Sequence, residues 1–361
     1  DLHLSIRRQR QMCIRDRLGA SDMTDARAWI RWLAPVVVLV IIGVVFRDQL
    51  PFLGEAFQAL RHARPAPVAA AVACAVLAIV AMAAVMRILL TKDGVRVNMA
   101  NTTAITLASN AWSTTIPGGP ALSAWLTFNV HRSWGASVGL CGWFFVISGA
   151  LSTVWMVVIG IAAVIFLGAH LSVLALAGSL TVAVGAIAGV FWAIYNPDVL
   201  RRWVRFLPEK VRGKVEEVID QLSSIRMTPG AFLAAATFSL LNQLIDVATL
   251  YFSVTAVTGA LPGLSAGLNE TTIQGVALAF IMTKLAGAAQ VTPGGIGTVE
   301  PVATASLVAS GLTLVDATAA TLIYRIISFA LITAIGWIIY LLAYAGKGFM
   351  LCLLYTSDAA D

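Results

Sequence analysis

The sequence predicts an all-α polytopic membrane protein: a helical bundle of about six full spans plus two broken or re-entrant hairpins related as inverted repeats, or about eight spans if both hairpins cross. Of its 361 residues, 59% are hydrophobic and only 12% are charged, too few polar groups for the surface of a soluble globule. Several apolar runs approach the roughly 20 residues that a helix needs to cross a bilayer, and none alternates like a transmembrane β-strand. Two short breaks, TIPGG at 115–119 and VTPGG at 291–295, interrupt apolar sequence in the two halves.

The apolar runs place the elements in order along the chain. Full spans are expected at about 30–46, 68–90, 136–167, 171–195, 231–258 and 317–345, and broken segments at about 99–130 and 272–312. Only about a dozen residues follow the first break before His131, which is short for a span. A re-entrant hairpin that enters and leaves on one side is therefore expected there. For the longer second segment, two tilted spans are an alternative.

Both tails differ in character from the rest of the chain. Residues 1–17 and 351–361 resemble translated sequencing adaptors, and we exclude them from the fold. The expected organisation is a single transmembrane domain over 28–345, with halves 28–195 and 231–345 joined by a cytoplasmic amphipathic loop at 196–230. Apolar residues in this loop recur at helical spacing opposite charged ones, which fits a helix on the membrane surface or a connector packed on the bundle. Acidic residues nearly balance its basic ones, so nucleic acid is not an expected partner.

Basic residues indicate the orientation of the spans. With the N-terminus inside, the outside face carries only Arg47, Arg61 and Arg64, whereas most other Lys and Arg residues fall inside. We therefore expect both termini to be cytoplasmic. The first hairpin then enters from the cytoplasm and the second from outside, as in inverted repeats.

The two breaks are the expected functional site. A helix cannot continue through Pro-Gly-Gly, and backbone groups left without partners survive at membrane depth only beside protein or a water-filled cavity. We expect residues 118–122 and 294–299 to point free amides into one shared cavity, a site for an anion. Hydrogen-bonding side chains on the arm before the first break would add to it.

Four charged residues fall within predicted membrane segments: Asp246, Lys284, Glu300 and Arg325. Glu300 and Arg325 are expected to form an ion pair, either as a packing device or with a role at the substrate. For Lys284, a substrate anion and Asp246 are competing partners. The expected substrate-binding residues are Asn110, Ser113, Thr115, Pro117, Gly118, Gly119, Lys284, Pro293, Gly294, Gly295, Gly297, Glu300 and Arg325.

Two sequence motifs of enzymes are missing from the chain. It contains no H-E-x-x-H metal site and no Walker loop. We expect no catalytic residue, metal or cofactor. An accessory or scaffold subunit for a membrane lipid-modifying or glycosyl-transferring enzyme is the alternative to a transporter.

The breaks carry a family resemblance. VTPGGIGTVE at 291–300, followed by LIYR at 322–325, resembles the C-terminal signature of the lysylphosphatidylglycerol synthase-like transmembrane (flippase-like) family, and Asn110 with TIPGG resembles its N-terminal half-motif. The resemblance covers roughly 28–345. It implies a multi-pass domain of the bacterial cytoplasmic (inner) membrane that moves anionic or aminoacylated phospholipid, or polyprenyl-linked lipid, between leaflets.

The resemblance also implies a possible separate lipid-modifying enzyme as partner. The chain departs from the family in having no soluble aminoacyl-transferase domain, so lipid synthesis is not expected of it. It departs again at 143–148, where WFFVIS stands in place of the acidic-basic pair that family members often carry.

Overall fold

The computed structural model describes residues 59–91, 94–116, 118–167, 227–288 and 292–345, with isolated residues between 177 and 216. The predicted spans at 30–46 and 171–195, the loop at 196–230 up to residue 226 and both tails lie outside the described residues, apart from those isolated positions. Residues Leu53–Tyr340 form one compact unit. The described residues are helical, with one isolated bridge between Gly263 and Thr272. The predicted polytopic helical fold is confirmed.

Four of the described helices are long and apolar enough to cross a membrane. They are α3 (Pro65–Leu90), α6 (Val138–Leu167), α10 (Pro229–Thr258) and a continuous helix made of α13 (Leu314–Arg325), the π-helix η4 (Ile326–Leu331) and α14 (Ile332–Ala343). Proline at the first position sets the start of α3 and α10, where a missing N–H costs nothing. Each of the four helices matches a predicted span.

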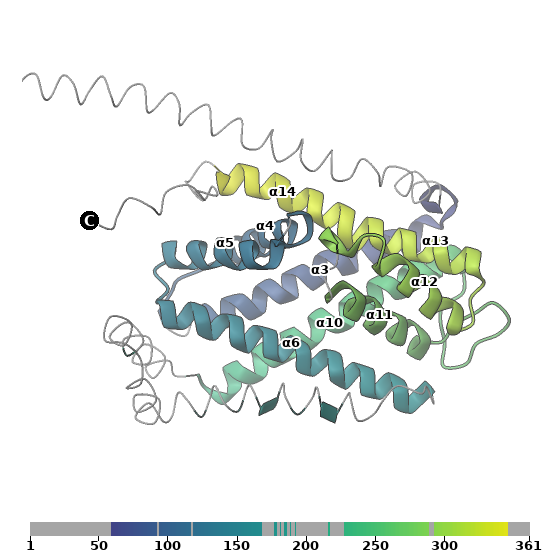
Figure 1. Cartoon of the computed structure of the whole chain (residues 1–361), viewed down its shortest axis with the longest axis horizontal. Coiled ribbons are helices and arrows are strands. Elements are labelled where there is room, and N and C mark those ends of the chain that lie inside the picture. The colour runs from purple at the N-terminus through teal and green to yellow at the C-terminus, as the bar shows by residue number, and fades with distance from the viewer. Residues whose placement is uncertain are drawn as a thin grey trace, which may run out of the picture. The chain divides into compact units, whose positions relative to one another are not determined.

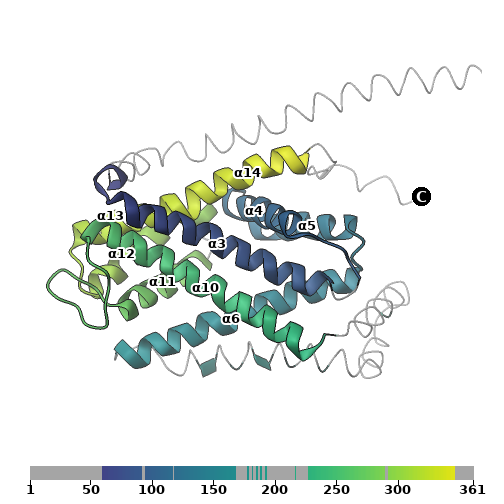
Figure 2. The same cartoon turned by 180° about the vertical axis from the view of Figure 1, so that it is seen from behind.

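Helices α3 and α10 lie side by side and run in opposite directions (Figure 2). The backbone N–H of Arg64 donates to the carbonyl of Ala256 at 2.9 Å, and Asn242 Nδ2 donates to the carbonyl of Ala78 at 2.8 Å. We call the end of the bundle where α3 finishes the first end, and the end where α3 starts the second end. Helix α10 therefore runs from the first end to the second.

The first broken segment is a hairpin of α4 (Met99–Thr115) and α5 (Gly119–Ser133). Its first arm starts soon after α3 finishes, and α6 starts soon after its second arm, so the hairpin opens at the first end (Figure 1). Helix α6 then crosses α10, where Gln243 Nε2 donates to Ser152 Oγ at 2.7 Å. The chain enters and leaves this hairpin on one side, as predicted.

The second broken segment consists of α11 (Ile273–Ala288), a short 3-10 turn at Pro293–Gly295 and α12 (Val299–Ala309). The residues that flank it meet: Thr271 Oγ1 donates to Ser310 Oγ at 2.8 Å, and the N–H of Thr313 donates to Asn269 Oδ1 at 2.7 Å. This segment is therefore a re-entrant hairpin and not two spans. It opens at the second end, so the two hairpins have the predicted inverted relation (Figure 1).

The arginines near the described helix ends fall into two groups, one at each end of the bundle, with the same members as in the predicted topology. Arg96 and Arg132 lie at the first end, next to the opening of the first hairpin, whereas Arg61 and Arg64 lie at the second end. At the second end, Arg64 Nη1 donates to the carbonyl of Gly259 at 3.0 Å, where α10 stops in a left-handed glycine cap.

Helix α14 holds the first hairpin in place. A Cβ added at Gly336 would overlap the carbonyl oxygen of Leu107, so glycine is what allows the two helices to approach this closely. Beside this contact, the rings of Trp112 and Trp337 stack with centroids 6.4 Å apart. Through these contacts, the continuous helix that begins next to the second hairpin also reaches the first.

Candidate functional site

The tips of the two hairpins meet between the ends of the bundle. Gly294, with φ +63°, lies against the ring of Phe329 and the carbonyl oxygen of Thr114; an added Cβ would overlap the ring and come within 3.0 Å of that oxygen. At the other tip, a Cβ on Gly119 would overlap the carbonyl oxygen of Ser113. Glycine at both tips is explained by this close approach of backbone and side chains.

Backbone groups in the breaks are largely satisfied inside the breaks themselves. This corrects the prediction that residues 118–122 and 294–299 point a row of free amides into the cavity. Tight turns at both sites use most of these N–H groups, because each turn folds the chain back onto an acceptor a few residues away. The acceptors are the carbonyl of Ile116 for Gly119 (2.8 Å), the carbonyl of Thr292 for Gly295 (2.9 Å) and the carboxylate of Glu300 for Gly297 (2.7 Å).

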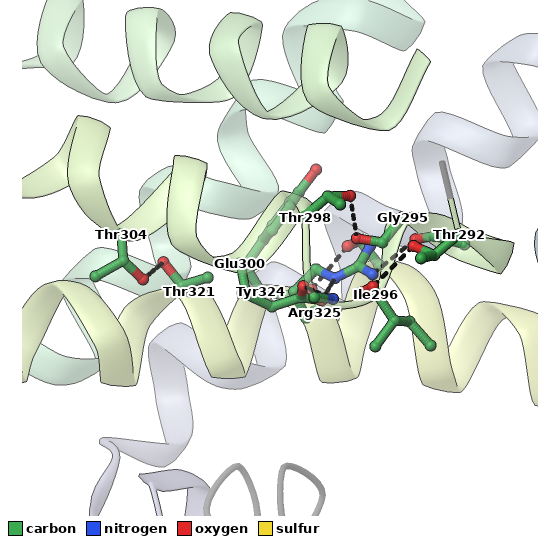
Figure 3. Close-up of polar contacts among 12 residues, drawn as sticks. Thr292, Gly295, Ile296, Thr298, Glu300, Thr304, Thr321, Tyr324 and Arg325 are labelled. Carbon is green, nitrogen blue, oxygen red and sulfur yellow. Dashed lines mark hydrogen bonds and ion pairs between the residues drawn. The ribbon is translucent and has the colours of Figure 1, made fainter. Parts of the chain in front are cut away.

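Glu300 and Arg325 form the predicted ion pair, with Arg325 Nε 2.7 Å from Glu300 Oε1 (Figure 3). The second oxygen of Glu300 accepts the N–H of Gly297, and Arg325 Nη2 donates to the carbonyl of Gly294 at 2.8 Å. The guanidinium also lies 4.6 Å from the centroid of the Phe329 ring. Both oxygens of Glu300 and two nitrogens of Arg325 are therefore hydrogen-bonded, and together the two residues clamp the tip of the second hairpin to α13.

Lys284 and Asp246 form a second ion pair, with Nζ 2.6 Å from Oδ2, which identifies Asp246 as the partner of Lys284 in this structure. The two pairs differ in access. The side chains of Lys284 and Asp246 are 39% and 18% exposed, whereas those of Arg325 and Glu300 are 9% and 11% exposed. The lysine pair joins α11 to α10 and is open to the space between the helices, whereas only Arg325 of the other pair reaches that space and little of its side chain is exposed.

That space is a cavity of about 710 Å³, lined by both hairpins and by α3, α6, α10 and the helix that contains Arg325. Most of the predicted site residues contribute to its wall. Those that line it are Asn110, Ser113, Gly118, Gly119, Lys284, Gly294, Gly295 and Arg325. The structure therefore brings the two distant breaks and the intramembrane cations together at one cavity.

Other predicted site residues lie elsewhere. Thr115 is buried and accepts a hydrogen bond from Trp337 Nε1 at 3.1 Å, so it fixes α14 to the first hairpin. Glu300 lies behind Arg325, and Gly297 is exposed outside the cavity wall. Pro117 lies outside the described residues, and for Pro293 only the backbone is described.

The cavity wall also includes polar residues that the sequence analysis did not select. The additional polar residues are Thr106, Thr114, Ser152, Asn242, Gln243, Thr283, Thr292, Tyr324 and Ser328. Asn242, Gln243 and Asp246 lie within one turn or so of each other on an otherwise apolar span, which places them on one face. That spacing of polar residues was the available signal, since polar groups in a membrane helix normally face the bundle interior.

Among the described residues, no group of three or more His, Cys, Asp or Glu side chains could hold a metal ion. The cavity wall offers a lysine ammonium, side-chain amides and hydroxyls. These groups can donate to an anionic oxygen, and Asp246 adds a carboxylate, the one acidic side chain among the described residues that line the cavity.

Comparisons with known proteins agree with this architecture. No curated protein matches the chain. Residues 27–336 match the family described as Lysylphosphatidylglycerol synthase TM region, which covers both hairpins and every residue that lines the cavity. The chain therefore belongs to the Lysylphosphatidylglycerol synthase TM region family, as its two Pro-Gly-Gly breaks suggested.

Proposed function

We propose that this protein moves a phospholipid or lipid-linked phosphate headgroup between the two leaflets of the membrane. The headgroup passes through the cavity while the acyl or isoprenoid chains stay in the bilayer. The observation that carries this proposal is the cavity of about 710 Å³, lined by both polar and apolar side chains, at the point where two re-entrant hairpins from opposite ends meet. Such sites between inverted, broken helices are where transporters bind their substrates. Membership of a lipid-related membrane family supports the same class of substrate.

The size of the cavity fits a headgroup. Ligand sites in proteins usually measure about 300 to 1,000 Å³, and the observed volume lies within this range. A headgroup fits such a space, but two long acyl chains do not fit with it. Because the chains are soluble in the surrounding lipid, only the polar part of the molecule needs a protein path.

The chemistry of the wall fits an anion. Lys284 is the more exposed of the two cations that line the cavity, and Asn110 and Ser113 provide hydrogen-bonding groups from the opposite hairpin. A phosphodiester offers one negative charge and several acceptor oxygens, which match an ammonium and neutral donors. We assign the binding of the phosphate to Lys284.

The proposed setting is the bacterial cytoplasmic membrane, with the first end facing the cytoplasm. Arg96 and Arg132 at that end support this orientation, because basic residues near membrane helices are retained on the cytoplasmic side. A substrate picked up from the inner leaflet would then meet the first hairpin before the second.

Reconstitution tests the proposal. Purified protein is placed in liposomes that contain fluorescent phosphatidylglycerol, its aminoacylated form or a glycosylated lipid, and dithionite quenching measures how fast the label changes leaflet. We expect faster exchange than in protein-free liposomes. Lys284→Gln should slow the rate by about tenfold, which corresponds to about 1.4 kcal/mol in the barrier.

Arg96→Gln is the matched control, because it removes the same charge from an exposed residue outside the cavity wall. It should leave the rate unchanged. If none of the lipids moves faster with protein than without, translocation is refuted. An accessory role beside a lipid-modifying enzyme would then replace it.

A further inference from the structure

We propose that the cavity takes up a proton together with its anionic headgroup, with Asp246 as the proton acceptor. The headgroup phosphate displaces Asp246 from Lys284, and the displaced carboxylate is protonated. This inference rests on the proposed headgroup passage and adds a second ligand to it, the proton. It would make the protein a carrier of an anion and H⁺ together.

An incoming anion must compete with Asp246 for the ammonium of Lys284. The other cation of the wall, Arg325, already donates from Nε to Glu300 and from Nη2 to the carbonyl of Gly294. Lys284 Nζ lies 2.6 Å from Asp246 Oδ2, and both side chains line the cavity. A phosphate that binds the ammonium therefore arrives beside the carboxylate that already holds it.

Protonation of one anion follows from electrostatics. Two negative charges beside one ammonium repel each other, and beside the Asp246 side chain, which is only 18% exposed, this repulsion favours protonation of one of them. A phosphodiester remains ionised at any physiological pH. The carboxylate of Asp246 is therefore the group that takes up the proton.

Charge balance supports the same result. The empty site holds the ammonium of Lys284 and the carboxylate of Asp246, which sum to zero. After binding, it holds the ammonium, the phosphodiester anion and a neutral carboxylic acid, which again sum to zero. The O–H bond that forms on Asp246 takes its proton from hydronium in the water, whose O–H bond breaks to leave a neutral water molecule, and no other covalent bond changes. The loaded site carries no net charge at membrane depth, where uncompensated charge is costly.

Among the described residues around the ion pair, Asp246 is the group that can accept the proton. From α13, Tyr324 and Arg325 both interact electrostatically with the pair, and the charge of Arg325 is balanced by Glu300. The lining residues of α3, α4 and α6 have apolar, hydroxyl or amide side chains. Asp246 is the one carboxylate among the described residues that line the cavity.

Titration calorimetry can count the proton. Full-length protein in detergent is titrated with dihexanoyl phosphatidylglycerol at pH 5.5 and pH 7.5, each in two buffers of different ionisation enthalpy. We expect uptake of about one proton per lipid, and an affinity that falls by up to about tenfold for each pH unit, because binding that takes up a proton weakens as protons become scarce. The phosphodiester itself does not titrate in this range, so the proton must go to the protein.

Variants assign the proton to its residue. Asp246→Asn should bind without proton uptake, and its affinity should be independent of pH. Glu270→Gln is the matched control, since Glu270 is exposed in the loop before α11, outside the cavity wall. It should keep the proton uptake of the wild type. Melting curves of each variant check that it is folded, and the wild-type proton count decides the question even if Asp246→Asn does not fold.

Several results would overturn the proposal. The proton proposal is refuted if the lipid binds without proton uptake, or if proton uptake persists in Asp246→Asn. Either result leaves the translocation proposal to be decided by the liposome assay. Absence of lipid binding at both pH values also removes it, and the liposome assay on the same preparation then shows whether translocation fails too. Equal binding of glycerophosphoglycerol, the deacylated headgroup, would refute the lipid assignment in favour of a soluble phosphodiester.

Discussion

Neutralising both members of the Glu300–Arg325 pair should destabilise the protein by less than the sum of the two single neutralisations. In the structure, each oxygen of Glu300 accepts a hydrogen bond from a different donor. Oε1 accepts from Nε of Arg325 and Oε2 accepts from the backbone N–H of Gly297, each at 2.7 Å. Glutamine has one acceptor oxygen, so in Glu300→Gln one of these donors faces an NH₂ group. The guanidinium also keeps its charge without a counterion.

The size of the expected loss in stability follows from how deeply the two side chains are buried. Both side chains are about one-tenth exposed, and removal of one partner of such a buried pair costs about 3 to 5 kcal/mol. Arg325→Gln should cost a similar amount, because it leaves a buried carboxylate with the Gly297 N–H alone and frees the carbonyl of Gly294. In the double variant no uncompensated charge is left. Its loss of stability should therefore be smaller than the sum of the two single losses by roughly 1 to 3 kcal/mol.

The assay is unfolding by sodium dodecyl sulfate in mixed micelles, followed by circular dichroism, for the wild type, both single variants and the double variant. Combining Glu300→Gln with Glu270→Gln provides a control cycle, since Glu270 lies in an exposed loop outside the pair. That combination should be additive. If the Glu300→Gln and Arg325→Gln costs also add to within about 0.5 kcal/mol, the two residues are uncoupled and the clamp described above is wrong.

Three further predictions follow from other contacts. Gly294→Ala should lower the free energy of unfolding by at least about 1 kcal/mol in the same assay, because the backbone at Gly294 is left-handed and the added Cβ would overlap the ring of Phe329. Gly142→Ala, on an open helix face, is the control and should be neutral or stabilising. Thr115→Val should cost about 1 to 3 kcal/mol, because the buried indole N–H of α14 loses its acceptor; a change within error would count against that bond. In a cysteine-free background, Ser265→Cys should react with an impermeant maleimide in intact cells and Ala100→Cys only after lysis; the reverse pattern would invert the proposed topology.

The architecture was predictable because its signals are local. Apolar length alone fixes a membrane helix, and Pro-Gly-Gly alone ends one, so the four long described helices and both hairpins fall where the sequence places them. The pairing of Glu300 with Arg325 was predictable as well, because an intramembrane charge needs a partner of opposite sign.

The cavity wall was harder to predict because it depends on how each helix is rotated. Neighbouring positions on a helix differ by about 100° around its axis, so Thr114 lines the cavity while Thr115 faces an indole. The sequence contains both threonines but no sign of this rotation, which is set by the packing of α14. The breaks were misjudged for a related reason: Pro-Gly-Gly shows that a helix stops, but the turn that follows decides which amides stay free.

The π-helix at Ile326–Leu331 has a consequence for insertions and deletions. Before it, Thr321 meets Thr304 of the second hairpin with hydroxyl oxygens 3.2 Å apart; after it, Thr333 meets Thr114 of the first hairpin at 3.1 Å. The wide turn thus sets the angle around the helix axis between Thr321 and Thr333, the two residues that attach this continuous helix to the hairpins. Loss of a single residue there would turn α14 by about 100° relative to α13 and swing its threonine and indole away from the first hairpin. The spacing between these attachments should therefore tolerate substitutions but not a change in length.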